Sequence, residues 1–261
     1  MIRSRRRWLA QAAALLLLWR PAITRGADWQ ATDAGTRITV VYDNVQHARG
    51  LTTAWGFAAV VDSGGERVLF DTGGDGATLL SNLARLGIAP ASIDAVVLSH
   101  FHADHIGGLE AFLAQRPAVT VYVPQSFPAE FRRLVERQGG IVDAVSGPRT
   151  LCANLHSTGE MGDATPEQAL IVDTPAGLVI LTGCAHPGVV AVARVARAYR
   201  RRDIHLLMGG FHLHARTPAE LDATLRALQE LGVRRVAPSH CTGERAIRAF
   251  RARWGDDFVE G

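Results

Sequence analysis

A cluster of metal-binding side chains in the middle of the chain constrains the fold more than any other feature of the sequence. Three histidines and an aspartate, His100, His102, Asp104 and His105, fall within six positions and follow a short apolar run at residues 95–98. His100 and His102 project to the same side if the backbone stays extended, whereas Asp104 and His105 then turn away and can serve a neighbouring ion. Imidazole and carboxylate groups suit Zn²⁺, and also iron or manganese. We therefore expect a strand that ends at a centre for one or two metal ions, with zinc as the preferred metal.

The composition is typical of one folded domain and excludes some mechanisms. The chain has 261 residues, of which 48% are hydrophobic and 20% are charged, so it can bury a full core and is not expected to be disordered. It contains no lysine, which excludes Schiff-base and P-loop mechanisms. Three cysteines in a chain of this length do not indicate a disulfide framework.

The first 27 residues have the features of an export signal. The basic segment at residues 3–7 precedes an apolar run at residues 8–19, which is too short to span a bilayer comfortably. The pair Arg5-Arg6 directly before this run favours a twin-arginine signal, with an ordinary secretory signal or an uncleaved anchor as alternatives. We expect cleavage near Ala27, a mature domain over residues 28–261, and a periplasmic or secreted protein.

Removal of this segment reverses the sign of the expected charge. The formal net charge of +3 includes six arginines and no acidic residue in the first 27 positions, so the mature chain has 22 basic and 25 acidic residues, a net charge of −3. It therefore has no overall attraction to nucleic acid or to an anionic membrane. We expect a small-molecule substrate, no nucleic-acid partner, and no stable membrane insertion after cleavage.

Strand and helix patterns alternate in both halves of the mature chain. Hairpins are predicted around Ser63-Gly64-Gly65-Glu66 and around Pro175-Ala176. A helix over 218–231 is predicted to start at the capping box Thr217-Pro218-Ala219-Glu220. This order predicts an α/β fold in which two β-layers are covered by helices on the outside.

The metal-binding pattern resembles that of a known family. His-x-His-x-Asp-His after a β-strand is similar to the signature of the metallo-β-lactamase superfamily, and the resemblance extends over nearly the whole mature chain. It implies an αββα sandwich of two mixed β-sheets. It also implies that Asp71, in Leu69-Phe70-Asp71-Thr72-Gly73, supports the metal loop through hydrogen bonds, and that His240 is the final ligand histidine.

Further segments resemble the subfamily named for dihydropterin–ribofuranosylaminobenzene-phosphate synthase. These segments are Ser157-Thr158-Gly159-Glu160, Glu167-Gln168-Ala169-Leu170, Thr182-Gly183-Cys184-Ala185-His186-Pro187-Gly188, Met208-Gly209-Gly210-Phe211-His212-Leu213 and Ser239-His240-Cys241-Thr242-Gly243. The coenzyme pathway in which that synthase acts is cytoplasmic, and such a location is hard to reconcile with an export signal.

Two departures from the superfamily pattern affect the expected ligands. Residues 157–160 stand where most members have a Gly-His loop with a ligand histidine, and Cys184 stands where most have a bridging aspartate. We infer that His186 replaces the missing histidine. Cys184 is either a metal ligand or a small residue packed beneath the site, and we interpret Cys241 as structural.

The resemblance implies a metal-dependent hydrolase in which two ions activate a water molecule that attacks a small ester, phosphoester, lactone or amide. One ion would be held by His100, His102 and His186, and the other by Asp104, His105 and His240. Asp104 and His212 are the candidate catalytic residues. In related tRNA 3′-processing nucleases a histidine at a strand end comparable to that of His212 contacts the scissile phosphate, although His212 could instead only hydrogen-bond a ligand.

Two other functions fit the same motifs. The first is a synthase-like transferase that uses the same metal site and requires a second substrate. The second is a non-catalytic periplasmic protein that binds a metal ion or a ligand, which would have a closed site without exchangeable water.

The arginine pair gives a direct test of the export prediction. Changing Arg5→Lys together with Arg6→Lys should leave the precursor in the cytoplasm, because the twin-arginine route requires both arginines. Cell fractionation and immunoblotting measure the outcome. Unchanged export of the variant would indicate the general secretory route instead.

Overall fold

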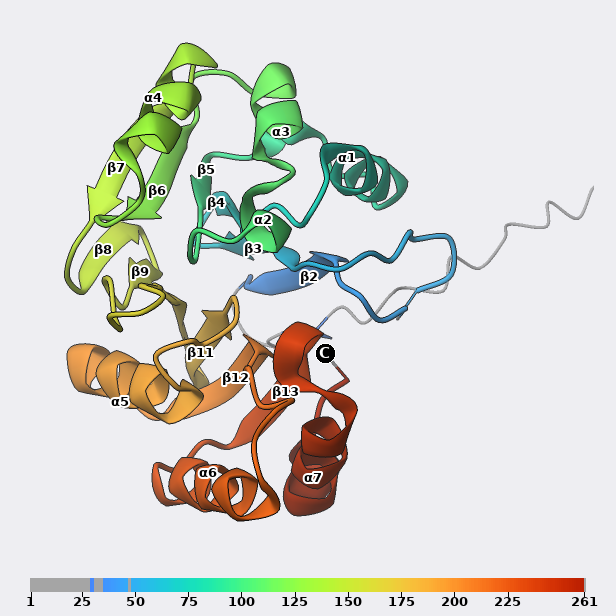
Figure 1. Ribbon diagram of the computed structural model, residues 1–261, viewed down its shortest axis with the longest axis vertical. Helices are drawn as coiled ribbons and strands as arrows, with labels where there is room; N and C mark the ends of the chain where they lie inside the picture. The colour runs from blue at the N-terminus through green and yellow to red at the C-terminus, as the bar shows by residue number, and fades with distance from the viewer. Residues whose placement is uncertain (1–28, 31–34, 47, 261) are drawn as a thin grey trace, which may run out of the picture.

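The structure is a computed structural model that describes residues 29–30, 35–46 and 48–260. Two β-sheets pack face to face, and helices cover the outer face of each sheet (Figure 1). Parallel and antiparallel pairs occur in both sheets. The predicted αββα arrangement of two mixed sheets is confirmed. The predicted signal segment, residues 1–27, lies outside the described residues.

The first sheet has the strand order β1-β2-β3-β4-β5-β6-β7, and the second has the order β13-β12-β11-β10-β9-β8. The strands of the first sheet are β1 (Trp29–Gln30), β2 (Arg37–Tyr42), β3 (Ala58–Ser63), β4 (Glu66–Phe70), β5 (Ala95–Val97), β6 (Thr120–Pro124) and β7 (Ile141–Val145). Those of the second are β8 (Arg149–Cys152), β9 (Leu155–Ser157), β10 (Leu170–Thr174), β11 (Gly177–Thr182), β12 (Ile204–Gly210) and β13 (Arg235–Ser239).

The helices lie outside the two sheets. They are α1 (Gly76–Arg85), α2 (Ala103–Ile106), α3 (Leu109–Gln115), α4 (Ala129–Arg137), α5 (Val189–Arg200), α6 (Pro218–Glu230) and α7 (Glu244–Trp254), with short 3-10 turns η1 (Pro90–Ser92), η2 (His240–Thr242) and η3 (Gly255–Asp257). The predicted capping box opens α6, where the side chains of Thr217 and Glu220 each accept from the backbone of the other. None of the described helices combines the length and the apolar character that a membrane span requires.

Three apolar cores hold these layers together. The central core lies between the sheets and includes Phe70, Leu181 and Met208. A second core packs α1, α3 and α4 on the first sheet, and a third packs α5, α6 and α7 on the second. Leu79 and Leu83 of α1 are fully buried, because their spacing of four residues places them on the same face of the helix.

The strand directions place the predicted site residues at one edge of the sandwich. Strands β4 to β7 run parallel in the first sheet, and β11 to β13 run parallel in the second. The loop with His100 follows β5, Cys184 follows β11, His212 follows β12, and His240 follows β13. Ligand sites of α/β sheets lie outside the carboxyl ends of such strands, and here the carboxyl ends of both sheets contribute.

The loop between β9 and β10 fastens the two sheets to each other. Its residue Gln168 is fully buried. The side-chain Nε2 donates to the carbonyl of Leu98, after β5, at 2.9 Å, and Oε1 accepts from the hydroxyl of Ser157, in β9, at 2.6 Å. The backbone N–H donates to the carbonyl of Ser99 at 2.9 Å. One amide group thus joins the end of β5 to the second sheet.

We expect Gln168→Leu to lower the free energy of unfolding by about 1–3 kcal/mol, because it removes the donor to the buried Leu98 carbonyl and the acceptor of the buried Ser157 hydroxyl proton. The control is Gln125→Leu at an exposed position, where a change within about 0.5 kcal/mol is expected. Urea unfolding at fixed metal concentration measures both. Equal stability of the two variants would contradict a bridging role for Gln168.

Candidate metal centre

The loop after β5 presents four ligand-type side chains in two directions. The backbone remains extended at His102, with φ −120° and ψ 146°. His100 and His102 therefore lie side by side, with Nε2 of His100 at 3.0 Å from Nδ1 of His102. Helix α2 then begins at Ala103 and turns Asp104 and His105 away from this pair. His100 and His105 are fully buried, whereas His102 is exposed.

Asp71 holds this loop from behind. Its carboxylate is fully buried and accepts from the backbone N–H of Ser99 at 2.6 Å and from the Ser99 hydroxyl at 2.7 Å. The same carboxylate lies 2.7 Å from Nδ1 of His105. It therefore fixes the ring of His105 so that Nε2 is left for the site.

The second sheet adds His186 to the pair formed by His100 and His102. The ring of His186 lies 4.8 Å from that of His100 and 4.9 Å from that of His102. These three side chains are the group that the sequence analysis assigned to one ion.

The second sheet also brings His240 to Asp104 and His105. Nε2 of His240 lies 3.3 Å from Oδ2 of Asp104, and the His240 ring lies 5.0 Å from that of His105. Oδ2 of Asp104 is also 3.6 Å from Nε2 of His105. Asn44, in the loop after β2, accepts from Nδ1 of His240 at 2.9 Å and holds its ring. This group matches the second predicted ligand set.

Cys184 lies between the two groups. It is 3% exposed, and its Sγ is 3.3 Å from Nε2 of His105. The thiol, one ring nitrogen of His100 and one of His186 all lie within 4.8 Å of one another, and the same holds for the thiol with His105 and His240. The sulfur therefore points toward the ligand nitrogens of both groups.

Glu167 is a site residue that the sequence analysis did not identify. Its buried carboxylate accepts from three successive backbone N–H groups, those of Cys184, Ala185 and His186, at 2.8–2.9 Å. It also lies 4.0 Å from Nδ1 of His100. Burial raises the pKa of Glu167 to about 6, although the three N–H groups oppose this rise. In the sequence, Glu167 appeared only as part of the segment Glu167-Gln168-Ala169-Leu170 that resembles the subfamily, with no role assigned to it.

Several residues around the site have a strained backbone. Asp71, Ala185, His212 and His240 have φ between +48° and +57°, in the left-handed region that non-glycine residues avoid. Such conformations cost roughly 1–3 kcal/mol each and persist only where the surroundings enforce them. At Ala185 the hydrogen bonds of Glu167 provide that enforcement. Strain of this kind is typical of functional sites.

The pKa shifts of three of these side chains suit metal binding. Burial and the neighbouring imidazoles hold the pKa of His100 far below its ordinary value. Burial and the nearby ring of His212 lower the pKa of His186 to about 4. Burial opposes the ionisation of Asp104, but the neighbouring imidazoles of His240 and His105 hold its pKa below the ordinary value. Neutral imidazole and ionised carboxylate are the forms that coordinate metal ions.

Unpaired ring nitrogen atoms at the site also fit the presence of a metal ion. Three buried nitrogen atoms, Nε2 of His186, Nδ1 of His212 and Nε2 of His240, lack a hydrogen-bond partner among the described residues. A buried polar atom left unpaired costs free energy. Coordination to a metal ion would satisfy such atoms, and the donor set of imidazole, carboxylate and thiol suits Zn²⁺.

His212, the predicted proton donor, lies beside these groups at the end of β12. Its ring is half-buried and lies 4.4 Å from that of His186 and 5.0 Å from that of His214. The structure thus brings every predicted site residue to the same edge of the sandwich.

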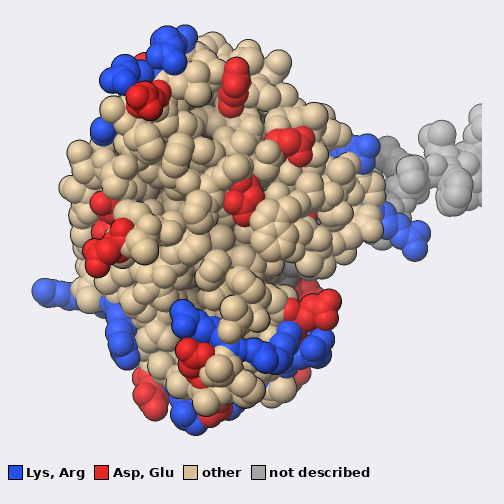
Figure 2. Space-filling model, in the orientation of Figure 1, with Lys and Arg blue, Asp and Glu red and all other residues tan. Residues whose placement is uncertain are grey.

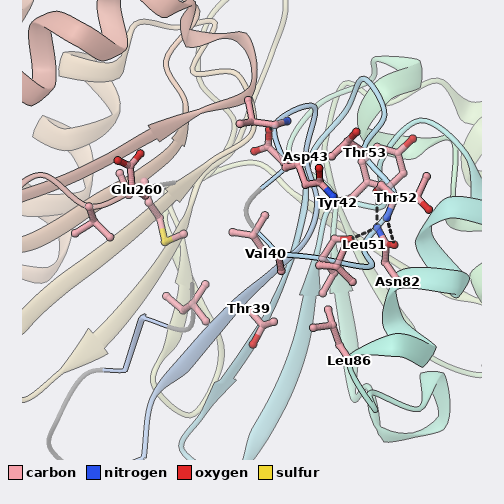
Figure 3. Close-up of a pocket in the computed structure, with 18 of the residues that line it drawn as sticks. Thr39, Val40, Tyr42, Asp43, Leu51, Thr52, Thr53, Asn82, Leu86 and Glu260 are labelled. Atoms are coloured by element: carbon pink, nitrogen blue, oxygen red, sulfur yellow. Dashed lines mark hydrogen bonds between the residues drawn. The ribbon is translucent and has the colours of Figure 1, made fainter. Parts of the chain in front are cut away.

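Other surface features lie apart from this centre. A hollow along β2, shown in Figure 3, is lined mainly by apolar and neutral side chains such as Val40, Leu51 and Leu86, and its described lining residues include no histidine or cysteine. Arginines gather over the lower part of the view in Figure 2, near the helices of the second sheet. On this face the described residues form no continuous basic surface across the two halves.

Comparisons with known proteins agree with the fold. The model of the metallo-beta-lactamase superfamily matches residues 56–240. The chain is 27% identical over 249 residues to 7,8-dihydropterin-6-methyl-4-(beta-D-ribofuranosyl)-aminobenzene-5′-phosphate synthase of Methanocaldococcus jannaschii, covering 77% of this chain and 85% of that protein.

Two solved structures are similar in fold. The first is Tm1679, described as a metal-dependent hydrolase of the beta-lactamase superfamily, with a TM-score of 0.73, 28% identity, and coverage of 87% of this chain and 96% of that one. The second is the metallo-beta-lactamase fold protein YhfI from Bacillus subtilis, with a TM-score of 0.62, 18% identity, and coverage of 87% and 94%. With its two-sheet sandwich and its histidine-rich edge, the chain belongs to the metallo-beta-lactamase superfamily.

Proposed function

We propose that the protein is a metal-dependent hydrolase, with Zn²⁺ as its metal, that cleaves a small ester, phosphoester, lactone or amide. The observation that carries this proposal is the pair of ligand groups at the shared edge of the two sheets, with buried ring nitrogens that find no hydrogen-bond partner among the described residues. The 28% identity to a protein described as a metal-dependent hydrolase supports it.

Each of the two ligand groups would hold one metal ion. His100, His102 and His186 would hold one ion, Asp104, His105 and His240 the other, and Cys184 lies within reach of both. Bound metal ions would polarise a carbonyl or phosphoryl oxygen of the substrate and lower the pKa of a water molecule toward neutrality.

The remaining roles belong to residues that support or complete these groups. The carboxylate of Asp104, as a catalytic residue as well as a ligand, would keep the attacking water oriented. His212, beside His186, would donate a proton to the leaving group or bind its developing charge. Asp71 and Glu167 would hold the ligand loops in place.

A transferase of the synthase type is a second candidate, because the similarity to the dihydropterin-linked synthase extends over 249 residues. It would use the same ligand groups but turn over only when a second substrate is present. A panel of single substrates, assayed with and without a candidate acceptor, separates the two functions. A non-catalytic binding protein would be inactive throughout the panel. We also propose that the protein acts after export, with a small molecule as its partner.

We expect the purified protein to contain close to one or two equivalents of metal, and the double variant His100→Ala, His102→Ala to lose most of it. The loss should also lower the melting temperature, because metal binding is coupled to folding. Elemental analysis and thermal unfolding measure the two effects. His205→Ala, on β12 but outside both ligand groups, is the control and should keep its metal. A wild-type metal content in the double variant would exclude this centre.

We expect His212→Ala to retain its metal and its fold but to lose kcat by ~10²–10⁴-fold, the usual contribution of a positioned acid or of a charge-stabilising group. KM should change little if the contact forms only in the transition state. Steady-state kinetics and metal content are measured together, with the exposed neighbour His214→Ala as the control. Metal loss in the His212 variant would make His212 a ligand, and full activity would make it structural.

A further inference from the structure

A third group of ligand-type side chains lies beside the two histidine groups. It consists of Cys184, Cys241 and His212, whose sulfur and ring nitrogen atoms all lie within 4.8 Å of one another. The cysteines are 3% and 4% exposed, and His212 is half-buried. Only Cys184 is shared with the other groups. Cys152, the third cysteine of the chain, lies apart in β8.

Three neighbouring strands build this group. Strands β11, β12 and β13 run parallel and adjacent (Figure 1), and Cys184, His212 and Cys241 each follow the end of one of them. Gly210 makes the close approach feasible, because a Cβ there would lie 2.8 Å from Sγ of Cys241 and 3.3 Å from Cα of Cys184. The backbone of His212 has φ +49°, and its Nδ1 is buried without a hydrogen-bond partner among the described residues.

The donor set differs in chemistry from the two histidine groups. Two thiols and one imidazole favour thiophilic ions such as Zn²⁺ or Cd²⁺. Tetrahedral coordination, with Zn–S near 2.3 Å and Zn–N near 2.0 Å, places ligand atoms about 3.5–3.8 Å apart. The present spacing therefore needs to close by only about 1 Å, which side-chain rotation can supply. Binding would release the two thiol protons to solvent and involve no change of oxidation state.

We propose that Cys184, Cys241 and His212 form an inhibitory site for a thiophilic divalent ion. The inhibitory part rests on the proposed hydrolase function, whereas binding of the ion does not. An ion in this position takes up a ring nitrogen of His212, so that His212 can no longer donate its proton. It also draws Sγ of Cys184 away from Nε2 of His105, which lies 3.3 Å from that sulfur. The site therefore allows an excess of soft metal to switch off an otherwise fully loaded enzyme.

The test is a cadmium titration of the reduced, zinc-loaded protein. Bound cadmium and retained zinc are measured by elemental analysis after desalting, thiolate coordination by the ultraviolet cadmium–sulfur band, and activity with the best substrate. Wild type and the matched control Cys152→Ser should each gain about one cadmium with the thiolate band, and should lose activity ~10²-fold or more, as when His212 is removed. Cys241→Ser should gain neither the cadmium nor the band, and should keep its own starting activity in cadmium.

Each other outcome overturns a defined part of the proposal. Equal cadmium binding and inhibition in Cys241→Ser and wild type would place the ion in the histidine groups and exclude the third site. A Cys184–Cys241 disulfide, seen by mass spectrometry in the reduced preparation, would also exclude it. If Cys241→Ser is less stable than wild type, Cys241→Ala must reproduce the loss of binding. Cadmium binding through thiolates in a protein that hydrolyses nothing would retain the site and reject the hydrolase function.

Discussion

The metal centre depends on holding two separately built sheets in a fixed position relative to each other. His100, His102, Asp104 and His105 belong to the first sheet, and the remaining ligand candidates follow strands of the second. A shift of about 1 Å between the sheets would separate the two halves of each group, because metal–ligand distances tolerate only about 0.2 Å. The central apolar core holds the two sheets together but does little to fix their relative position, since apolar contacts are non-directional. The relative position of the sheets must therefore be fixed by hydrogen bonds, which are directional, and the segment with Glu167 and Gln168 provides them.

Buried carboxylates do most of this positioning. Asp71 joins Ser99 to His105 within the first sheet. Glu167 holds the turn after β11, while its own backbone pairs with that of His100 in an isolated bridge. Hydrogen bonds to a charged acceptor are stronger than neutral ones, and in a buried setting they are costly to leave unmade. The strained conformations at Ala185 and elsewhere show that this positioning opposes the intrinsic preference of the backbone.

Local signals made much of the architecture predictable from the sequence. Helix α6 spans Pro218–Glu230, within one residue of the predicted 218–231, because the capping box marks its start. Strands β7 and β8 were not predicted, since they are short, largely half-exposed and lie at the sheet edges, and β9 was not predicted because it has only three residues. The candidate ligands of the first sheet could be named because they lie close together in the sequence and share a loop, whereas His186 and His240 were named from the family resemblance. Glu167 could not be named, because its role depends on bonds to a turn 17–19 residues further along the chain, and Cys241 was interpreted as structural because nothing local shows its proximity to Cys184.

The way in which Glu167 holds the turn after β11 bears on how such centres diversify. It accepts only from main-chain N–H groups, those of residues 184–186. The shape of the turn is therefore independent of the side chains that it carries. An exchange of the thiol at position 184 for a carboxylate would therefore leave the scaffold beneath it unchanged. The type of donor atom that this turn presents is thus separated from the folding of the turn, so that a single substitution would change the donor from soft to hard.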